Sequence, residues 1–450
     1  MEDKKSFYKT LLSIGAPMAV SQLIAAFINM LDTFMLGGVS EQVLTAAGLA
    51  NKVFFVYILI VYGVGSASGI FMAQHYGKGD VSTVKRFLGL ALIGSSATAL
   101  IFTLGALIFT ENIMHMFTAD PAVVGYGVQY IRIVAISYLP TAISNSIYGA
   151  LRCARHPKIP MLFSVLALCV NATFNSLFIF VFNMGITGAA YATLIARCVE
   201  AIGVTTVLLL KNTALKGKLL EYFRFRRDDV RRLIKTGWPV IAVEGTWALG
   251  NTMYMLAFRA YGSSAQAAVQ VGDSFLILFN VLSIALGCSA AVIIGNTIGA
   301  GKKDVARGYS RTFYRLSIIM GAIIAALGLA FIPLLPIMFP KLTAEGLNYA
   351  RQALLVVALS FVIRCMEFML MVGVLRAGGD TRFCIVLDMT CVWVITLPLL
   401  LVASYVLHLP FVVVYIMINI EMLIKIIVAS FRFFGSDVWL NDLTVTEAVS

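Results

Sequence analysis

Four acidic residues stand within long apolar stretches of this 450-residue chain without a basic residue one helical turn away: Asp32, Glu244, Asp273 and Asp388. An unpaired carboxylate is costly in hydrocarbon, so it should reach water, take up a proton or bind a cation. Asp273 and Asp388 lie near the ends of their stretches, where we expect contact with solvent and assign no role. Asp32 and Glu244 lie deeper, and there we expect reversible protonation or cation binding.

Glu244 begins a polar stripe on one helical face. Its members recur at i, i+3, i+7 and i+10, and they are Glu244, Trp247, Asn251 and Tyr254. A shift of the sequence by 222 residues places this stripe over Gln22, Ala25, Asn29 and Asp32. Inside a membrane such stripes must face protein or water, and aromatic faces attract organic cations. We therefore expect a cavity that binds a cationic substrate; ordinary packing of Trp and Tyr is the alternative.

Three neutral polar residues accompany the acids. Asn171 and Asn175 are four residues apart, and therefore on one helix face, and Thr193 lies in the next apolar stretch. Together with Asp32 they would form an oxygen cage for Na⁺, or a hydrogen-bond network around a protonated carboxyl. Hydrogen bonds that merely join helices are the alternative.

Three further acids have a basic residue three or four positions away, which places both charges on one helix face. These spacings predict ion pairs between Arg197 and Glu200, between Arg364 and Glu367, and between Glu421 and Lys425. Internal neutralisation explains all three acids. Glu367 remains a second-rank candidate for the substrate site.

The elements that must position these residues are transmembrane helices. The chain is 60% hydrophobic and 12% charged, with a mean hydropathy of +0.92, whereas soluble proteins have about a quarter charged residues. Apolar runs of about 20 residues predict membrane spans, and twelve are found: 11–37, 48–74, 84–110, 122–148, 158–182, 186–210, 233–260, 268–296, 312–337, 346–374, 383–405 and 409–433. The fold class is an all-α membrane protein.

The loop charges predict the orientation of these spans. With the N-terminus inside, the inner segments hold 26 basic residues and the outer ones five, so both termini should be cytoplasmic. The longest polar stretch, Lys211 to Lys235, contains nine basic residues. Its segment Leu219 to Leu233 mixes apolar and basic side chains, as an interfacial helix does. We predict six-helix bundles at 1–210 and 233–450, joined by a basic linker at 211–232.

A weak internal repeat supports this division. The 222-residue shift also aligns Gly15 and Pro17 with Gly237 and Pro239, and a shift of 224 aligns the segment ending at Arg152 with that ending at Arg376. Both halves then have one orientation, an arrangement found in many transporters, with substrate bound near the membrane midplane between the repeats.

Several other functions are disfavoured. The sequence has no P-loop spacing, the four histidines are isolated, and no cysteine pair has metal-site spacing. We therefore expect no enzymatic activity, no resident cofactor and no nucleic-acid partner. The expected partners are the lipid bilayer and small organic molecules, with H⁺ or Na⁺ as the coupling ion.

The order of several short strings resembles the multidrug and toxic compound extrusion (MATE) family over nearly the whole chain. In the first half these are the stretch from Pro17 to Asp32-Thr-Phe-Met, Gln74-His-Tyr-Gly77-Lys-Gly79, Leu151-Arg152, the stretch from Asn171 to Asn175, and the stretch from Gly188 to Thr193. In the second half they are Gly295-Asn-Thr-Ile-Gly-Ala-Gly301 and Leu375-Arg-Ala-Gly-Gly-Asp-Thr381.

The resemblance implies two six-helix bundles in a V around a central cavity, and export of organic cations against H⁺ or Na⁺. It implies that Asp32 is the coupling acid, with Asn171 and Thr193 in its polar cluster. Where family members often have Asp, this chain has Asn175, which favours protons slightly. Glu244 matches an acid of the second bundle in some relatives. A monomer in the cell membrane is expected; a flippase of lipid-linked precursors and a channel are the alternatives.

Overall fold

The structure is a computed structural model that describes residues 4–37, 39–118, 120–210, 213–258, 261–338 and 344–444. Every regular element in these ranges is a helix, as predicted. Two compact units are present, Lys4–Ile241 and, from Ala242, the remainder of the described chain. The boundary falls within one helix, two residues beyond Pro239. Each unit is described on its own.

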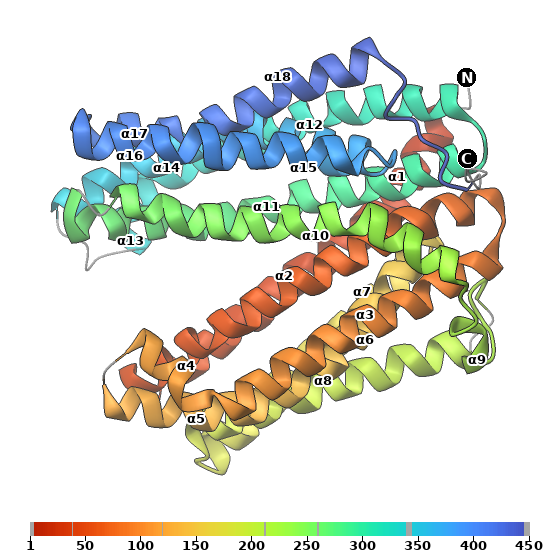
Figure 1. Cartoon of the computed structure of the whole chain (residues 1–450). Coiled ribbons are helices and arrows are strands. Elements are labelled where there is room, and N and C mark those ends of the chain that lie inside the picture. The colour runs from red at the N-terminus through yellow and green to blue at the C-terminus, as the bar shows by residue number, and fades with distance from the viewer. Residues whose placement is uncertain are drawn as a thin grey trace. The chain divides into compact units, whose positions relative to one another are not determined.

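The first unit contains the red, orange and yellow helices of Figure 1 and the start of the green helix α10. They are α1 (Lys4–Gly37), α2 (Glu41–Lys78), α3 (Val81–Ile108), α4 (Thr110–Phe117), α5 (Pro121–Val134), η1 (Ala135–Ser137), α6 (Tyr138–Cys153), α7 (Lys158–Asn175), η2 (Ser176–Val181), α8 (Gly185–Leu210), α9 (Leu219–Tyr222) and the start of α10 (Arg227–Phe258). Helices α2, α3 and α6 pack on one another, and α1 packs on α7 and α8.

The second unit contains the rest of α10 and the following helices. They are α11 (Gly262–Gly299), α12 (Lys303–Phe331), η4 (Ile332–Leu334), α13 (Leu335–Met338), α14 (Ala344–Phe368), η5 (Met369–Arg376), α15 (Thr381–Met389), η6 (Thr390–Thr396), α16 (Leu397–Leu401), η7 (Val402–Val406), α17 (Phe411–Met417) and α18 (Ile420–Gly435). Helices α11, α12 and α14 pack on one another.

In the described part of the chain, ten helical stretches are long and apolar enough to cross a membrane. They correspond to ten of the twelve predicted spans. The other two predicted spans, 11–37 and 233–260, fall on α1 and α10, which are 34 and 32 residues long. Both helices continue through an internal proline, Pro17 and Pro239. The protein is therefore a multi-pass membrane protein.

Each unit has its own aromatic core. In the first, the rings of Tyr57 and Tyr138 stack with centroids 4.6 Å apart, and the Tyr57 hydroxyl donates to the Tyr138 carbonyl at 2.6 Å. In the second, Phe258 packs against Phe411 and Tyr415. Such rings bury large apolar areas and fix the helices that hold the polar residues in place.

The linker between the halves differs from its prediction. A continuous interfacial helix over Leu219 to Leu233 is wrong, because α9 ends at Tyr222 and α10 begins at Arg227. Tyr222 is buried, and its hydroxyl donates to the Leu215 carbonyl at 2.7 Å. An ideal Cβ on Gly89 of α3 would lie 1.7 Å from the Tyr222 carbonyl oxygen. The linker backbone therefore packs directly on α3 at this glycine.

Gly89→Val should displace the linker from α3. Any side chain at position 89 overlaps the Tyr222 backbone, which cannot move aside as a flexible side chain does, and overpacking of this kind costs about 1–3 kcal/mol. We expect a lower melting temperature in detergent and faster proteolysis within residues 213–226. Gly105→Val is the matched control, because nothing lies within 4 Å of a Cβ at Gly105. Equal stability of the two variants would contradict the close approach.

Candidate functional site

The three neutral polar residues of the first unit form one chain of hydrogen bonds. Asn175 Nδ2 donates to Asn171 Oδ1 at 3.1 Å, and Asn171 Nδ2 donates to Thr193 Oγ1 at 3.4 Å. Both asparagines are buried, at 1% and 0% exposure. Helix α7, which holds both asparagines, is the main packing partner of α1, and α1 also touches α2 and α8. The predicted grouping of Asn171, Asn175 and Thr193 is therefore present, on two helices that contact the helix containing Asp32.

Several predicted site residues lie outside the described side chains. Their backbone belongs to α1 or α10, and they are Asn29, Asp32 and Asn251; the side chain of Asp273 on α11, to which no role was assigned, is not described either. Gln22 is described and is half-buried on α1. The polar stripe of the first half therefore stays a prediction at its two most polar positions, Asn29 and Asp32.

The first unit also contains a buried ion pair that the spacing predicted. Arg197 Nη1 donates to Glu200 Oε2 at 3.0 Å, which confirms the pair. The Tyr148 hydroxyl of α6 donates to the other carboxylate oxygen, Oε1, at 2.7 Å. Both oxygens of Glu200 are thus satisfied, so this acid has a structural explanation and is not a candidate for ion coupling.

The densest group of charges surrounds Lys425 of α18 in the second unit. Lys425 is 1% exposed, and its Nζ donates to Asp388 Oδ1 at 2.5 Å and also to Glu421 Oε1. The Tyr254 hydroxyl of α10 donates to Glu421 Oε2 at 2.5 Å. The predicted pair of Glu421 and Lys425 is confirmed, and one buried cation serves two buried carboxylates from two helices.

Asp388 corrects a prediction. We expected this acid to be a solvated helix end, but it is 4% exposed and paired with Lys425. The two residues are 37 positions apart, on α15 and α18, so no helical spacing rule reveals the pair. Asp388 is therefore part of the buried Lys425 cluster.

The structure also corrects the prediction that Glu244 has no basic partner. Arg376 Nη1 donates to its Oε1 at 2.9 Å, across 132 positions of sequence. The Arg376 side chain is 6% exposed and that of Glu244 is 25% exposed. Arg376 was assigned to a loop from the sequence, yet it is buried at the end of η5. The charge of Glu244 is thus balanced within its own unit.

Glu244→Gln should test how much this ion pair stabilises the second unit. Arg376 would keep a neutral acceptor but lose its anionic partner, and weakening a buried charged hydrogen bond costs about 1–3 kcal/mol. We expect a lower free energy of unfolding in detergent, measured by denaturant titration. Asp304→Asn is a suitable control, because the Asp304 side chain is 96% exposed. Unchanged stability of Glu244→Gln would show that the pair is not structural.

Glu367 is the remaining candidate acid of the second unit. No direct ion pair between Glu367 and Arg364 is found among the described residues. Glu367 does lie within electrostatic range of Arg364, and also of Lys425, Asp388 and Glu421. It therefore borders a cluster in which the acids outnumber the nearby bases by one.

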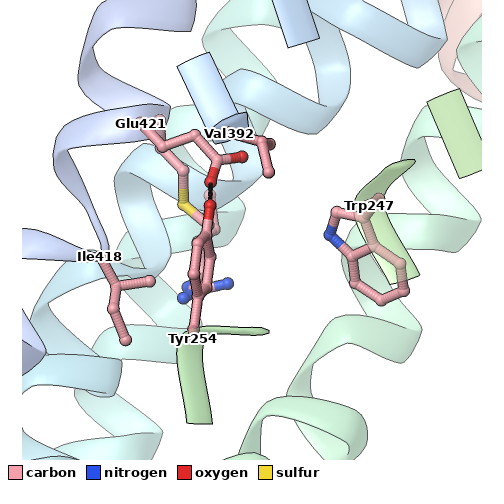
Figure 2. A pocket seen from close by; sticks show the side chains of 7 residues that line it. Trp247, Tyr254, Val392, Ile418 and Glu421 are labelled. Atoms are coloured by element: carbon pink, nitrogen blue, oxygen red, sulfur yellow. Dashed lines mark hydrogen bonds between the residues drawn. The ribbon is translucent and has the colours of Figure 1, made fainter. Parts of the chain in front are cut away.

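A very small pocket of about 20 Å³ opens beside this cluster (Figure 2). It is lined by Trp247, Tyr254, Arg364, Val392, Ile418, Glu421 and Met422. Trp247 is 42% exposed, and it lies on the opposite side of the pocket from Ile418 in the view of Figure 2. Two members of the predicted aromatic stripe, Trp247 and Tyr254, thus line one pocket. This volume holds about one water molecule and is far below that of ligand sites, so the pocket is closed to a whole substrate in this structure.

Three candidate residues lie where an α-helix changes into a π-helix. Asn175 directly precedes η2, and Glu367 and Asp388 precede η5 and η6 by two residues each. Short π-helical segments often occur at functional sites, because the extra residue frees backbone groups and redirects side chains. The polar residues of both units are thus placed at irregular points of their helices.

Sequence reasoning missed two contacts of the bases in the second unit, that of Arg376 with Glu244 and that of Lys425 with Asp388. Arg364, Arg376 and Lys425 all lie in or beside the polar group, and only Lys425 was assigned a contact correctly. The available signal was the presence of bases inside apolar stretches, which is as unusual as that of acids. Among the described residues no three His, Cys, Asp or Glu side chains form a metal site. The Na⁺ cage proposed around Asp32 falls outside that description.

Comparison with known proteins adds independent observations. The MatE family model matches residues 17–177 and 239–402. The chain is 23% identical over 410 residues to "Uncharacterized transporter YisQ" of Bacillus subtilis, covering 88% of each chain. It is 26% identical over 409 residues to "Probable multidrug resistance protein NorM" of Deinococcus radiodurans, covering 87% of each.

A solved structure has the same fold. The bent form of the Vibrio cholerae MATE transporter VcmN matches with a TM-score of 0.85 and 19% identity, over 96% of this chain and 97% of that one. At this identity the match concerns the fold. It agrees with the helix order described above.

Proposed function

Because the chain belongs to the MatE family, we propose that it is a secondary antiporter that exports small organic, mostly cationic and amphipathic compounds in exchange for H⁺ or Na⁺. Relatives of similar length are named multidrug resistance proteins, which supports this substrate class. The expected location is the cell membrane, with both termini in the cytoplasm, as the loop charges favour.

One observation supports the coupling site most directly. The helix that contains Asp32 packs on the two helices that hold Asn171, Asn175 and Thr193. A carboxyl group near such a chain has hydrogen-bond partners in either protonation state, which suits a group that takes up and releases a proton inside a membrane.

The proposed cycle couples this acid to substrate release. From outside, Asp32 takes up a proton or Na⁺, which cancels the charge that attracts a cationic substrate. The substrate then leaves, and the protein returns to its inward-open state. Coupling requires that the ion binds the two states with different affinities. Pro17 in α1 and Pro239 in α10 are the positions where these helices lack a backbone donor and bend most readily.

Protons are slightly favoured over Na⁺. Na⁺ prefers several oxygen ligands with negative charge among them, and the buried partners on α7 and α8 are neutral amides and a hydroxyl. One carboxylate, Asp32, is the only acid proposed for the cage. A single titrating carboxyl needs no further anion.

The substrate is proposed to contact the polar and aromatic residues predicted from the repeat, which are Gln22, Asn29, Glu244, Trp247, Asn251, Tyr254 and Glu367. Trp247 and Tyr254 supply aromatic faces in the small pocket of the second unit. Since Arg376 balances Glu244, Glu367 is the acid of this unit that is better suited to attract a cation.

The decisive experiment uses the purified protein in liposomes with a fluorescent organic cation as the substrate. A pH gradient and a Na⁺ gradient are imposed separately. Transport driven by the pH gradient alone supports proton antiport, and transport driven by Na⁺ alone replaces the proton with Na⁺. Transport that follows only the gradient of the cation itself would refute antiport. Counterflow with internal unlabelled substrate distinguishes this carrier from a channel.

A further inference from the structure

A second pocket lies where the start of α3 meets the linker between the two halves. It has a volume of about 440 Å³, is open to solvent, and is lined by Val81, Ser82, Lys85, Arg86, Glu221, Arg224 and Arg226. Val81 and Ser82 begin α3, which is long and apolar enough to span a membrane. The pocket therefore lies at a membrane surface, and the transport proposal makes no use of it.

Two of the four basic residues in this pocket are paired with acids, and, among the described residues, the other two are not. Lys85 Nζ donates to Glu221 Oε2 at 2.7 Å, and Arg86 lies 3.4 Å from Asp229. The hydrogen bond from Lys85 holds the pKa of Glu221 below its usual range, so Glu221 stays anionic and balances Lys85. Arg224 and Arg226 make no ion pair with any described residue, and both side chains are exposed. Two positive charges thus remain available.

Apolar side chains border this positive pocket. Leu219, Leu220 and Phe223 are 59%, 70% and 42% exposed, although Tyr222 between them is buried against α3. The buried tyrosine and the contact at Gly89 fix the linker on α3, so the exposed residues are held in place. Apolar residues next to arginines at a span end are typical of a segment that lies in the lipid interface.

We propose that this pocket binds the phosphate headgroup of an acidic phospholipid. Arg224 and Arg226 contact the phosphate, since guanidinium groups match its geometry and charge. Leu219, Leu220 and Phe223 enter the upper part of the acyl-chain region beside it. Clusters of basic residues next to membrane spans bind anionic lipids in this way. The bound lipid would fasten the linker between the two halves to the bilayer.

The test uses native mass spectrometry of the full-length protein in detergent. The protein is mixed with equal amounts of phosphatidylglycerol and phosphatidylcholine that have the same acyl chains. Wild type should retain phosphatidylglycerol preferentially. Arg224→Gln with Arg226→Gln should weaken that retention about tenfold or more, because each basic residue near an anionic headgroup contributes about fivefold. Arg224→Lys with Arg226→Lys should retain part of the preference, because lysine keeps the charge but not the paired donors of the guanidinium group.

Arg311→Gln with Arg315→Gln is the matched control. Both arginines are exposed on α12, and the change in net charge is the same. Equal losses in the two double variants, or no loss in either, would refute the site. If inorganic phosphate stabilised the protein as much as phosphatidylglycerol does, a lipid would be refuted as the occupant.

Two additional variants keep the result interpretable. Leu219→Ser with Leu220→Ser leaves the charges intact and should also weaken retention, which provides a second test if the arginine variant does not fold. Asp32→Asn should retain phosphatidylglycerol like wild type, because the lipid site does not depend on ion coupling. Failure of the transport proposal would therefore leave this result unaffected.

Discussion

Asp32→Asn should reduce ion-driven export to the level of protein-free liposomes while the protein stays folded. Asparagine has nearly the shape of aspartate and, like the protonated acid, has one acceptor oxygen and a donor group, but it neither takes up a proton nor carries a charge at neutral pH. In the proposed cycle the return step depends on that change of charge, so its removal uncouples the gradient from the substrate. The measurement is uptake of a fluorescent cation under an imposed pH gradient, with the melting temperature in detergent alongside.

The control for this variant is Asp304→Asn, which removes the same charge from an exposed position. Counterflow exchange of the substrate, which needs no ion gradient, should persist in Asp32→Asn if only coupling is lost. Full pH-dependent export by Asp32→Asn would eliminate this residue as the coupling acid. Attention would then move to Glu367, the other candidate acid, which makes no ion pair among the described residues.

Lys425→Met should destabilise the protein by about 3–5 kcal/mol, because removing one partner of a buried ion pair leaves an uncompensated charge. Here the loss leaves two carboxylates, Asp388 and Glu421, which are 4% and 5% exposed. Their mutual repulsion adds to the cost. The free energy of unfolding in detergent, from denaturant titration followed by tryptophan fluorescence, measures the effect.

A second substitution tests the cause. Lys425→Met combined with Asp388→Asn and Glu421→Gln removes the buried charges altogether, and it should recover much of the lost stability, because neutral or apolar replacements of buried ion networks are often tolerated. Lys303→Met, at an exposed lysine of α12, should change stability by less than about 0.5 kcal/mol. A loss below about 1 kcal/mol in Lys425→Met would mean that the cluster is not the structural centre of its unit.

The sequence predicted the helices well, because apolar runs of fixed length have few alternatives in a membrane. It also predicted the ion pairs Arg197–Glu200 and Glu421–Lys425, which follow from positions three and four apart on a helix. Thr193 was grouped correctly with Asn171 and Asn175, although it lies on a different helix.

The partners of Glu244 and Asp388 were beyond such reasoning. Arg376 and Lys425 are 132 and 37 residues away from them, and contacts between helices depend on packing that local spacing does not encode. The prediction of a helix over Leu219 to Leu233 was wrong for a similar reason. The burial of Tyr222 against Gly89 interrupts an amphipathic pattern that, by itself, favours one continuous helix.

The π-helical segment η6, two residues beyond Asp388, is followed directly by α16, so a change of its geometry would move the helix beyond it. A segment that tightens into α-helical geometry turns everything after it by about 100° and advances it by about 1.5 Å, which is the step of one residue. Such a slip changes which side chains face a neighbouring helix without breaking the covalent or overall helical path. A change of charge at Asp388, beside this segment, would favour one register over the other, so it would be converted into rotation of α16 and η7.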